Sequence, residues 1–168
     1  DAPLTITAPG TESGTYDSFY ELALQKTAEA RAKEGKNADA EGKPAQTIRK
    51  DYSSQANDNA ILTGIEGSKS SFGWVGFSYA VEAGDKVKMI EIDGGKGCVK
   101  PTPETIADNT YPLSRYLYIY VNKAKAGSNP AVKSYVDFYL SDDGIKAVTE
   151  VDYVALAAAD LEATRKVW

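Results

Sequence analysis

The stretch from Leu4 to Leu24 reads LTITAPGTESGTYDSFYELAL and combines a strand pattern, a turn and the start of a helix. Residues 4–7 alternate apolar and polar side chains as a half-buried strand does, and Ala8-Pro9-Gly10 ends that pattern. From Thr15 the apolar residues recur at the spacing that gives a helix one apolar face. They are Tyr16, Phe19, Tyr20, Ala23 and Leu24. We therefore expect a strand over 4–7, a polar turn and a helix over 15–33.

Strand and helix patterns alternate along the rest of the chain. Helical patterns follow Ser53-Ser54, which we expect to cap a helix that ends at Gly67, and recur over 132–139, over 144–150 and near the C-terminus. Extended patterns cover 48–52, 72–77, 87–92 and 116–121. The last of these, YLYIYV, is a continuous apolar run, which predicts a core strand covered on both faces. The alternation is typical of an α/β fold.

The composition excludes several classes of function. With 168 residues, 42% of them hydrophobic, the chain can form one packed core. Histidine is absent, which argues against the usual Ser-His-Asp and Cys-His enzymes and against HExxH metal sites. The formal net charge of -5 disfavours a nucleic-acid partner held by a general basic field. We expect no metal and no cofactor, and an anionic ligand would have to be bound locally.

Cys98 is the single cysteine, so an internal disulfide is excluded. Two interpretations stay open for it: a lone thiol, or a disulfide with a part of the protein outside this chain.

The turn Gly10-Thr11-Glu12-Ser13-Gly14-Thr15 concentrates the chemistry of the sequence. A helix start carries unpaired backbone N–H groups and a partial positive charge, serine and threonine add hydroxyl donors, and glycine lets an oxyanion approach the backbone. A purely structural interpretation is also open, in which Ser13 or Thr15 caps the helix and Gly10 makes the turn. The turn lacks the lysine of a nucleotide-binding loop and the GxSxG spacing of a nucleophile elbow.

An ordered series of motifs resembles the phosphate-binding proteins of ABC-type importers. The turn and its flanks are similar to the family's GPGTxSGTxDYF segment. Later motifs match in the same order: Arg49-Lys50-Asp51-Tyr52, Asn57-Asp58-Asn59, Gly73-Trp74-Val75-Gly76-Phe77, Pro101-Thr102-Pro103-Glu104-Thr105-Ile106 and Tyr111-Pro112-Leu113-Ser114-Arg115. Each motif is weak alone, and the series extends through most of the chain.

The resemblance implies an α/β fold, namely one lobe of a two-lobed, class II periplasmic-binding-protein-like receptor with a mixed sheet flanked by helices. Residues 1–112 would form the anion-binding second lobe. Residues 113–168 would form a crossover strand and C-terminal helices that return to a first lobe absent from this chain. The implied function is capture of inorganic phosphate for the membrane permease of an ABC importer, without catalysis, in the periplasm or at the cell surface.

The resemblance also implies which residues bind phosphate: Ser13, Gly14 and Thr15, together with an arginine. Better-known members carry that arginine four residues before the serine, where this chain has Pro9. Arg49 is the expected substitute and Arg115 the second choice. Supporting positions are Thr11, Glu12, Asp51, Asp58 and Asn59.

Two alternatives to a phosphate receptor remain at this stage. One is a receptor for another oxyanion or for a phosphate-bearing metabolite. The other is a surface adhesin or sensor that reuses the fold for protein contacts.

Overall fold

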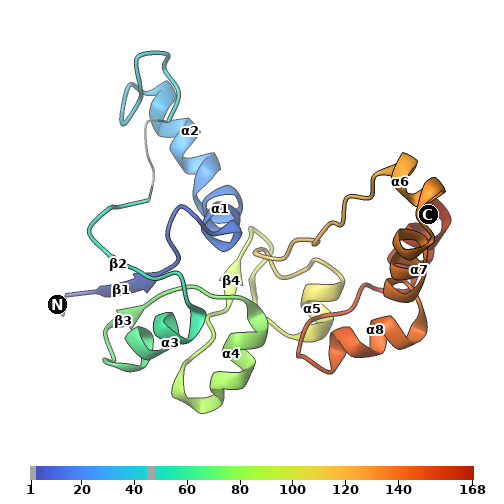
Figure 1. Cartoon of the computed structure of the whole chain (residues 1–168). Coiled ribbons are helices and arrows are strands. Elements are labelled where there is room, and N and C mark those ends of the chain that lie inside the picture. The colour runs from blue at the N-terminus through green and yellow to red at the C-terminus, as the bar shows by residue number, and fades with distance from the viewer. Residues whose placement is uncertain (1–2, 45–47) are drawn as a thin grey trace. The chain divides into compact units, whose positions relative to one another are not determined.

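The computed structural model describes residues 3–44 and 48–168, which divide into two compact units (Figure 1). Unit 1 is Asp1–Ile90 and unit 2 is Glu91–Trp168. The candidate turn lies in unit 1. This division lies before residue 112, and the expected boundary of the anion-binding lobe stays a prediction.

Unit 1 is built on a parallel sheet in the order β2-β1-β3. The central strand β1 (Thr5–Ala8) pairs with β2 (Ser53–Ser54) on one edge and with β3 (Ser71–Phe72) on the other. The C-terminal end of β1 is buried, since Ala8 is 0% exposed and Thr7 is 6% exposed. The strand expected over 4–7 is confirmed with a shift of one residue. The extended segment expected over 48–52 is wrong as a strand, because pairing begins only at Ser53.

One helical run links β1 to β2. It consists of α1 (Gly14–Phe19), a π-helical turn η1 (Tyr20–Leu24) and α2 (Gln25–Lys33). The helix expected over 15–33 is therefore confirmed, with a change of helical pitch in its middle that the apolar spacing did not indicate. Ala28 and Ala32 are its buried residues in α2.

The helix α3 (Asp58–Glu66) links β2 to β3 and buries Ile61 and Leu62. Its N-cap is Asn57, whose Oδ1 accepts hydrogen bonds from the backbone N–H groups of Asn59 and Ala60. The expected cap at Ser53-Ser54 was wrong, because both serines pair with β1 instead.

After β3 the chain leaves the sheet at Gly73. The strand expected over 72–77 is limited to Ser71–Phe72, and Phe77 already begins α4 (Phe77–Ala83), which is followed by the 3-10 turn η2 (Gly84–Lys86).

Unit 2 contains a short antiparallel pair and five helices within its described residues. The strands are β4 (Ile92–Asp93) and β5 (Cys98–Val99), so the strand expected over 87–92 was wrong except at its last residue. Cys98 is an exposed thiol. The helices are α5 (Pro103–Ala107), α6 (Lys123–Ser128), α7 (Pro130–Tyr139), α8 (Asp142–Thr149) and α9 (Ala158–Val167). Among the described helices, none is both long and apolar enough to cross a bilayer.

The segment 116–121 is the clearest correction to the sequence-based expectations. It is extended, but it belongs to no strand in the described structure. The side chains of residues 117–120 are exposed, among them Leu117 at 63% and Tyr120 at 95%, whereas Tyr116 and Val121 are half-buried. The prediction of a buried core strand assumed partner strands and covering layers, and the described part of the chain supplies neither.

Two glycines let neighbouring elements close on β1 at Thr7. A Cβ added to Gly73 would lie 2.1 Å from the carbonyl oxygen of Thr7, and one added to Gly64 would lie 2.4 Å from the Thr7 Oγ1. Both separations are far below van der Waals contact, so the sheet and α3 approach each other only because these residues lack side chains.

We predict that Gly73→Ala lowers the free energy of unfolding by about 1–3 kcal/mol, because the added methyl group overpacks a backbone contact. Urea denaturation is the measurement. Gly76→Ala is the matched control, since its Cβ would meet its nearest neighbour at an ordinary 3.7 Å. Equal effects of the two substitutions would contradict the explanation by close approach.

Candidate anion-binding site

The candidate turn lies at the carboxyl edge of the parallel sheet, directly after the central strand. From β1 the chain connects to β2 on one side, and from β2 it passes to β3 on the other side. The strand order therefore reverses next to β1. In open α/β sheets, ligands bind outside the carboxyl ends of the strands at such a reversal. The architecture alone thus selects the region after Ala8.

Backbone hydrogen bonds close the turn. The N–H of Ser13 donates to the carbonyl of Gly10 at 3.0 Å, and the N–H groups of Tyr16 and Asp17 donate to the carbonyl of Ser13. Ser13 is the N-cap of α1, and its Oγ accepts the N–H of Thr15 at 3.1 Å. The hydroxyl proton of Ser13 is not consumed by that bond, because the oxygen acts as the acceptor. The cap and a role as an anion donor are therefore compatible.

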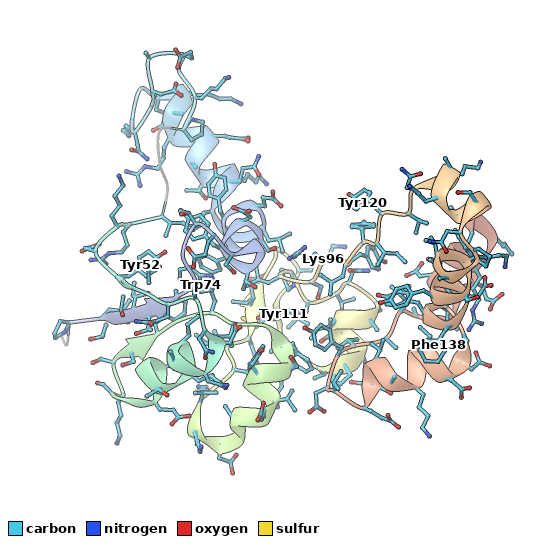
Figure 2. All side chains as sticks on the ribbon, in the orientation of Figure 1. Tyr52, Trp74, Lys96, Tyr111, Tyr120 and Phe138 are labelled. Atoms are coloured by element: carbon cyan, nitrogen blue, oxygen red, sulfur yellow. The ribbon has the colours of Figure 1, made fainter. Side chains whose placement is uncertain are left out.

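An aromatic cluster holds the turn and α1 against the sheet. Trp74, which follows β3, stacks on Phe19 of α1 with ring centroids 4.1 Å apart and planes 10° apart. Tyr52 and Phe72 lie tilted against the same indole at 6.0 and 6.4 Å. Figure 2 shows Tyr52 and Trp74 close to the end of β1. These contacts connect residues in or next to β2 and β3 to the first helix.

Tyr52 also fixes the backbone of the turn directly. Its hydroxyl donates to the carbonyl oxygen of Pro9 at 2.8 Å. Burial raises the pKa of Tyr52, the nearby Tyr16 raises it further, the Ser54 hydroxyl lowers it and the Glu12 carboxylate raises it. The phenol thus stays protonated at neutral pH and keeps its donor role.

Arg49 is paired with Asp51 through two parallel hydrogen bonds. Its Nε donates to Oδ1 at 2.6 Å and its Nη2 donates to Oδ2. The pair is solvent-exposed, with 56% of the arginine side chain accessible. Hydrogen bonding to Arg49 is the main reason that the pKa of Asp51 falls to about 2, and the residue's own backbone N–H lowers it further. The structure thus orients the guanidinium by a carboxylate, and its assignment to an anion stays a prediction.

The other expected site residues have separate positions. Thr11 and Glu12 are exposed within the turn. Asp58 and Asn59 form the first turn of α3, where Asn57 is the cap, and the carboxylate that pairs with Arg49 belongs to Asp51. Arg49 and Asp51 belong to the same unit as the turn, and Arg115 belongs to unit 2. The roles of Arg49 and Arg115 at an anion stay predictions.

Ser54 and Tyr52 are residues that sequence reasoning missed at this edge. Ser54 ends β2 and pairs with Ala8, and a Cβ added to Gly10 would lie 2.4 Å from its Oγ. A usable signal was present, because hydroxyl residues that end a parallel strand meet at the edge where ligands bind. The expectation that Ser54 caps a helix concealed this signal.

Comparison with known proteins places the chain in a family. A model of the PBP superfamily domain matches residues 1–143. Protein SphX of Synechocystis is 34% identical over 157 residues, which cover 93% of this chain and 41% of that protein. The phosphate-binding protein PstS of Staphylococcus aureus is 33% identical over 156 residues, which cover 92% of this chain and 41% of that protein.

A solved structure gives the same result. The crystal structure of a possible phosphate binding protein from Planctomyces limnophilus superposes with a TM-score of 0.70 at 33% identity. The match covers 99% of this chain and 53% of that one. The chain therefore spans about half of the structure and about two-fifths of the relatives that it matches. Because the family model covers most of the sequence and the α/β architecture agrees, the chain belongs to the PBP superfamily.

Proposed function

We propose that this chain is one wall of a receptor that captures inorganic phosphate and delivers it to the permease of an ABC importer. The observation that carries the proposal is the Ser13-Gly14-Thr15 turn at the carboxyl edge of β1, where a strand reversal and a helix start coincide. The names of the relatives in Staphylococcus aureus and Planctomyces limnophilus support phosphate as the ligand. Such a receptor would act in the periplasm or at the cell surface.

The turn offers the chemistry that a phosphate needs. Phosphate oxygens are hydrogen-bond acceptors, and the hydroxyls of Ser13 and Thr15 are half-buried donors next to a helix start. Hydrogen bonds from these donors to a charged oxygen are shorter and about twice as strong as neutral ones. Since the net charge of the whole chain is -5, local donors rather than a general field would hold the anion.

Arg49 is the proposed source of positive charge. A guanidinium has five N–H donors, and the pair with Asp51 uses only one on Nε and one on Nη2. The remaining donors point along other directions of the same rigid plane, so Asp51 can orient the group while an anion binds elsewhere on it. We propose this arrangement in preference to an arginine from outside unit 1.

The rest of the protein would supply the second wall. The apolar residues 117–121, of which 117–120 are exposed, are the proposed crossover into it. This strand-forming run pairs with no strand in the described part of the chain, and such a run needs a sheet to pair with. Tyr116, at the start of this segment, donates to Asp160 at 2.9 Å and accepts from Asn109 at 2.7 Å. Figure 2 shows Tyr120 on the extended segment that follows. The extended segment and α7 border a hollow, whose lining includes Ile119, Tyr120, Val121, Val132, Tyr135 and Val136.

We predict that Ser13→Ala and Thr15→Ala each weaken phosphate binding by about 1–3 kcal/mol, the scale for hydrogen bonds to a charged group. Isothermal titration calorimetry on the full-length protein measures the effect, with sulfate and arsenate titrated in parallel to test oxyanion selectivity. Ser18→Ala is the control, because its hydroxyl already donates to the Gly14 carbonyl.

Unchanged phosphate affinity in both turn variants would reduce the turn to a helix cap. Tight binding of a different oxyanion by the wild-type protein would keep the proposed receptor function but replace phosphate with that oxyanion as the ligand.

We predict that phosphate affinity falls in the order wild type, Arg49→Lys, Arg49→Met, because lysine keeps the charge and loses the two-pronged geometry. NMR titration of the Asp51 carboxyl group tests whether Arg49 is the partner that lowers its pKa. Its pKa of about 2 should rise toward the ordinary value, ~4, in Arg49→Met. Because Arg49 lowers the pKa of Asp51 in the folded protein, their ion pair stabilises the fold at pH values above the carboxyl's unfolded-state pKa. That stabilisation is lost as the pH falls toward about 2. Normal phosphate binding by Arg49→Met would transfer the role to Arg115 or to the second wall.

For the crossover, we predict slow hydrogen exchange at the backbone amides of residues 117–121 in the full-length protein and fast exchange in the chain of residues 1–168. Mass spectrometry after deuterium labelling makes this comparison, and the amides of α3 serve as the internal reference. Fast exchange in both proteins would show that the segment is not paired, and residues 113–168 would then need a different role.

A further inference from the structure

We infer that the hydroxyl of Ser54 is a third hydroxyl donor to the anion, beside those of Ser13 and Thr15, and is contributed by the strand next to the turn. The inference rests on the proposed function, and it concerns a residue that neither the motif series nor the helix start indicates. Its evidence is the register of the parallel sheet and the space above Gly10.

The register brings Ser54 to the turn. Ser54 pairs with Ala8, and the N–H of the next residue, Gln55, donates to the Ala8 carbonyl at 3.0 Å. Because β1 and β2 are parallel, both end at the same edge of the sheet, and Ser54 is the last residue of β2. Residues more than 40 positions apart in sequence are thereby placed side by side.

The space above Gly10 is occupied by polar oxygens. A Cβ on Gly10 would lie 2.4 Å from the Ser54 Oγ and 2.3 Å from the Glu12 Oε2. Gly10 is buried and has no positive φ, so its small size rather than its backbone freedom is what this position needs. The missing side chain lets the Ser54 hydroxyl lie against the backbone of the turn.

This space suits an oxygen of a bound anion. The carbonyl oxygen of Gly10 accepts the N–H of the cap residue Ser13 at 3.0 Å, and the Ser54 Oγ lies beside the same glycine. A carboxylate oxygen of Glu12 shares this space. A carboxylate oxygen and a phosphate oxygen are both acceptors, and Glu12 is exposed, so its side chain can leave as the anion enters. Ser54 would then donate to phosphate from the β2 side while Ser13 and Thr15 donate from the helix side.

Ser53 provides a matched control on the same strand. Successive side chains of a strand point to opposite faces, and the Ser53 Oγ accepts a hydrogen bond from the Gln55 Nε2 at 3.2 Å. Both serines are exposed, and both would lose the same hydroxyl on replacement by alanine. The two serines differ in the direction of the side chain and in its partner, since the Ser54 hydroxyl interacts with the Tyr52 phenol, whose pKa burial raises and this hydroxyl lowers.

The test is calorimetric titration of inorganic phosphate into full-length wild type, Ser54→Ala, Ser53→Ala and Ser54→Thr. We expect Ser54→Ala to bind about tenfold to a hundredfold more weakly, Ser53→Ala to bind as the wild type does, and Ser54→Thr to recover most of the affinity because it keeps the hydroxyl. Thermal unfolding of each ligand-free variant gives a second readout, and it should be the same for Ser53→Ala and Ser54→Ala.

Three results separate the possibilities. Normal binding by Ser54→Ala alongside weak binding by Ser13→Ala overturns the role of Ser54 and leaves the proposed function intact. Equal losses of affinity in Ser53→Ala and Ser54→Ala also overturn it, because the effect would then come from the pairing of β2. Absence of phosphate binding in the wild-type protein would overturn the proposed function itself.

Discussion

The parallel pairing of β1 with a strand on each edge is the constraint on which the candidate site depends. It brings the ends of β1 and β2 to one edge, and it places the reversal of strand order next to the turn. The pairing requires glycine at two positions against Thr7, where any side chain would collide. The aromatic packing of Trp74 on Phe19 then holds the first helix at that edge. Loss of the sheet would disperse every residue assigned to the anion.

In the candidate site, neighbouring residues orient several of the polar groups. Tyr52 holds the Pro9 carbonyl, Ser13 caps its own helix, and Asp51 orients the guanidinium of Arg49. Fixed donors lose little conformational entropy on binding, which favours affinity for a small anion. In the proposed receptor, short-range hydrogen bonds would outweigh the diffuse repulsion of an acidic chain, which salt screens within about 8–10 Å.

The largely exposed segment 117–121 and the open edge of the sheet have a common explanation in the proposed receptor. The first is a strand-forming run that pairs with no strand among the described residues, and the second would present the proposed phosphate donors from one side only. Both would be completed by the part of the protein that relatives possess beyond the matched region. Enclosure between two walls removes water and strengthens each hydrogen bond to the anion.

The sequence by itself determined the features that local interactions control. The helix from Gly14 to Lys33, the polar turn before it and the family all followed from spacing and motif order. Only the tertiary structure decided that Ser54 pairs with Ala8 rather than capping a helix, and that residues 117–120 of the apolar run 116–121 are exposed. Helix periodicity and capping involve residues within a few positions of one another. Strand register and burial depend on partners far away in the chain, or outside it, and no local pattern specifies them.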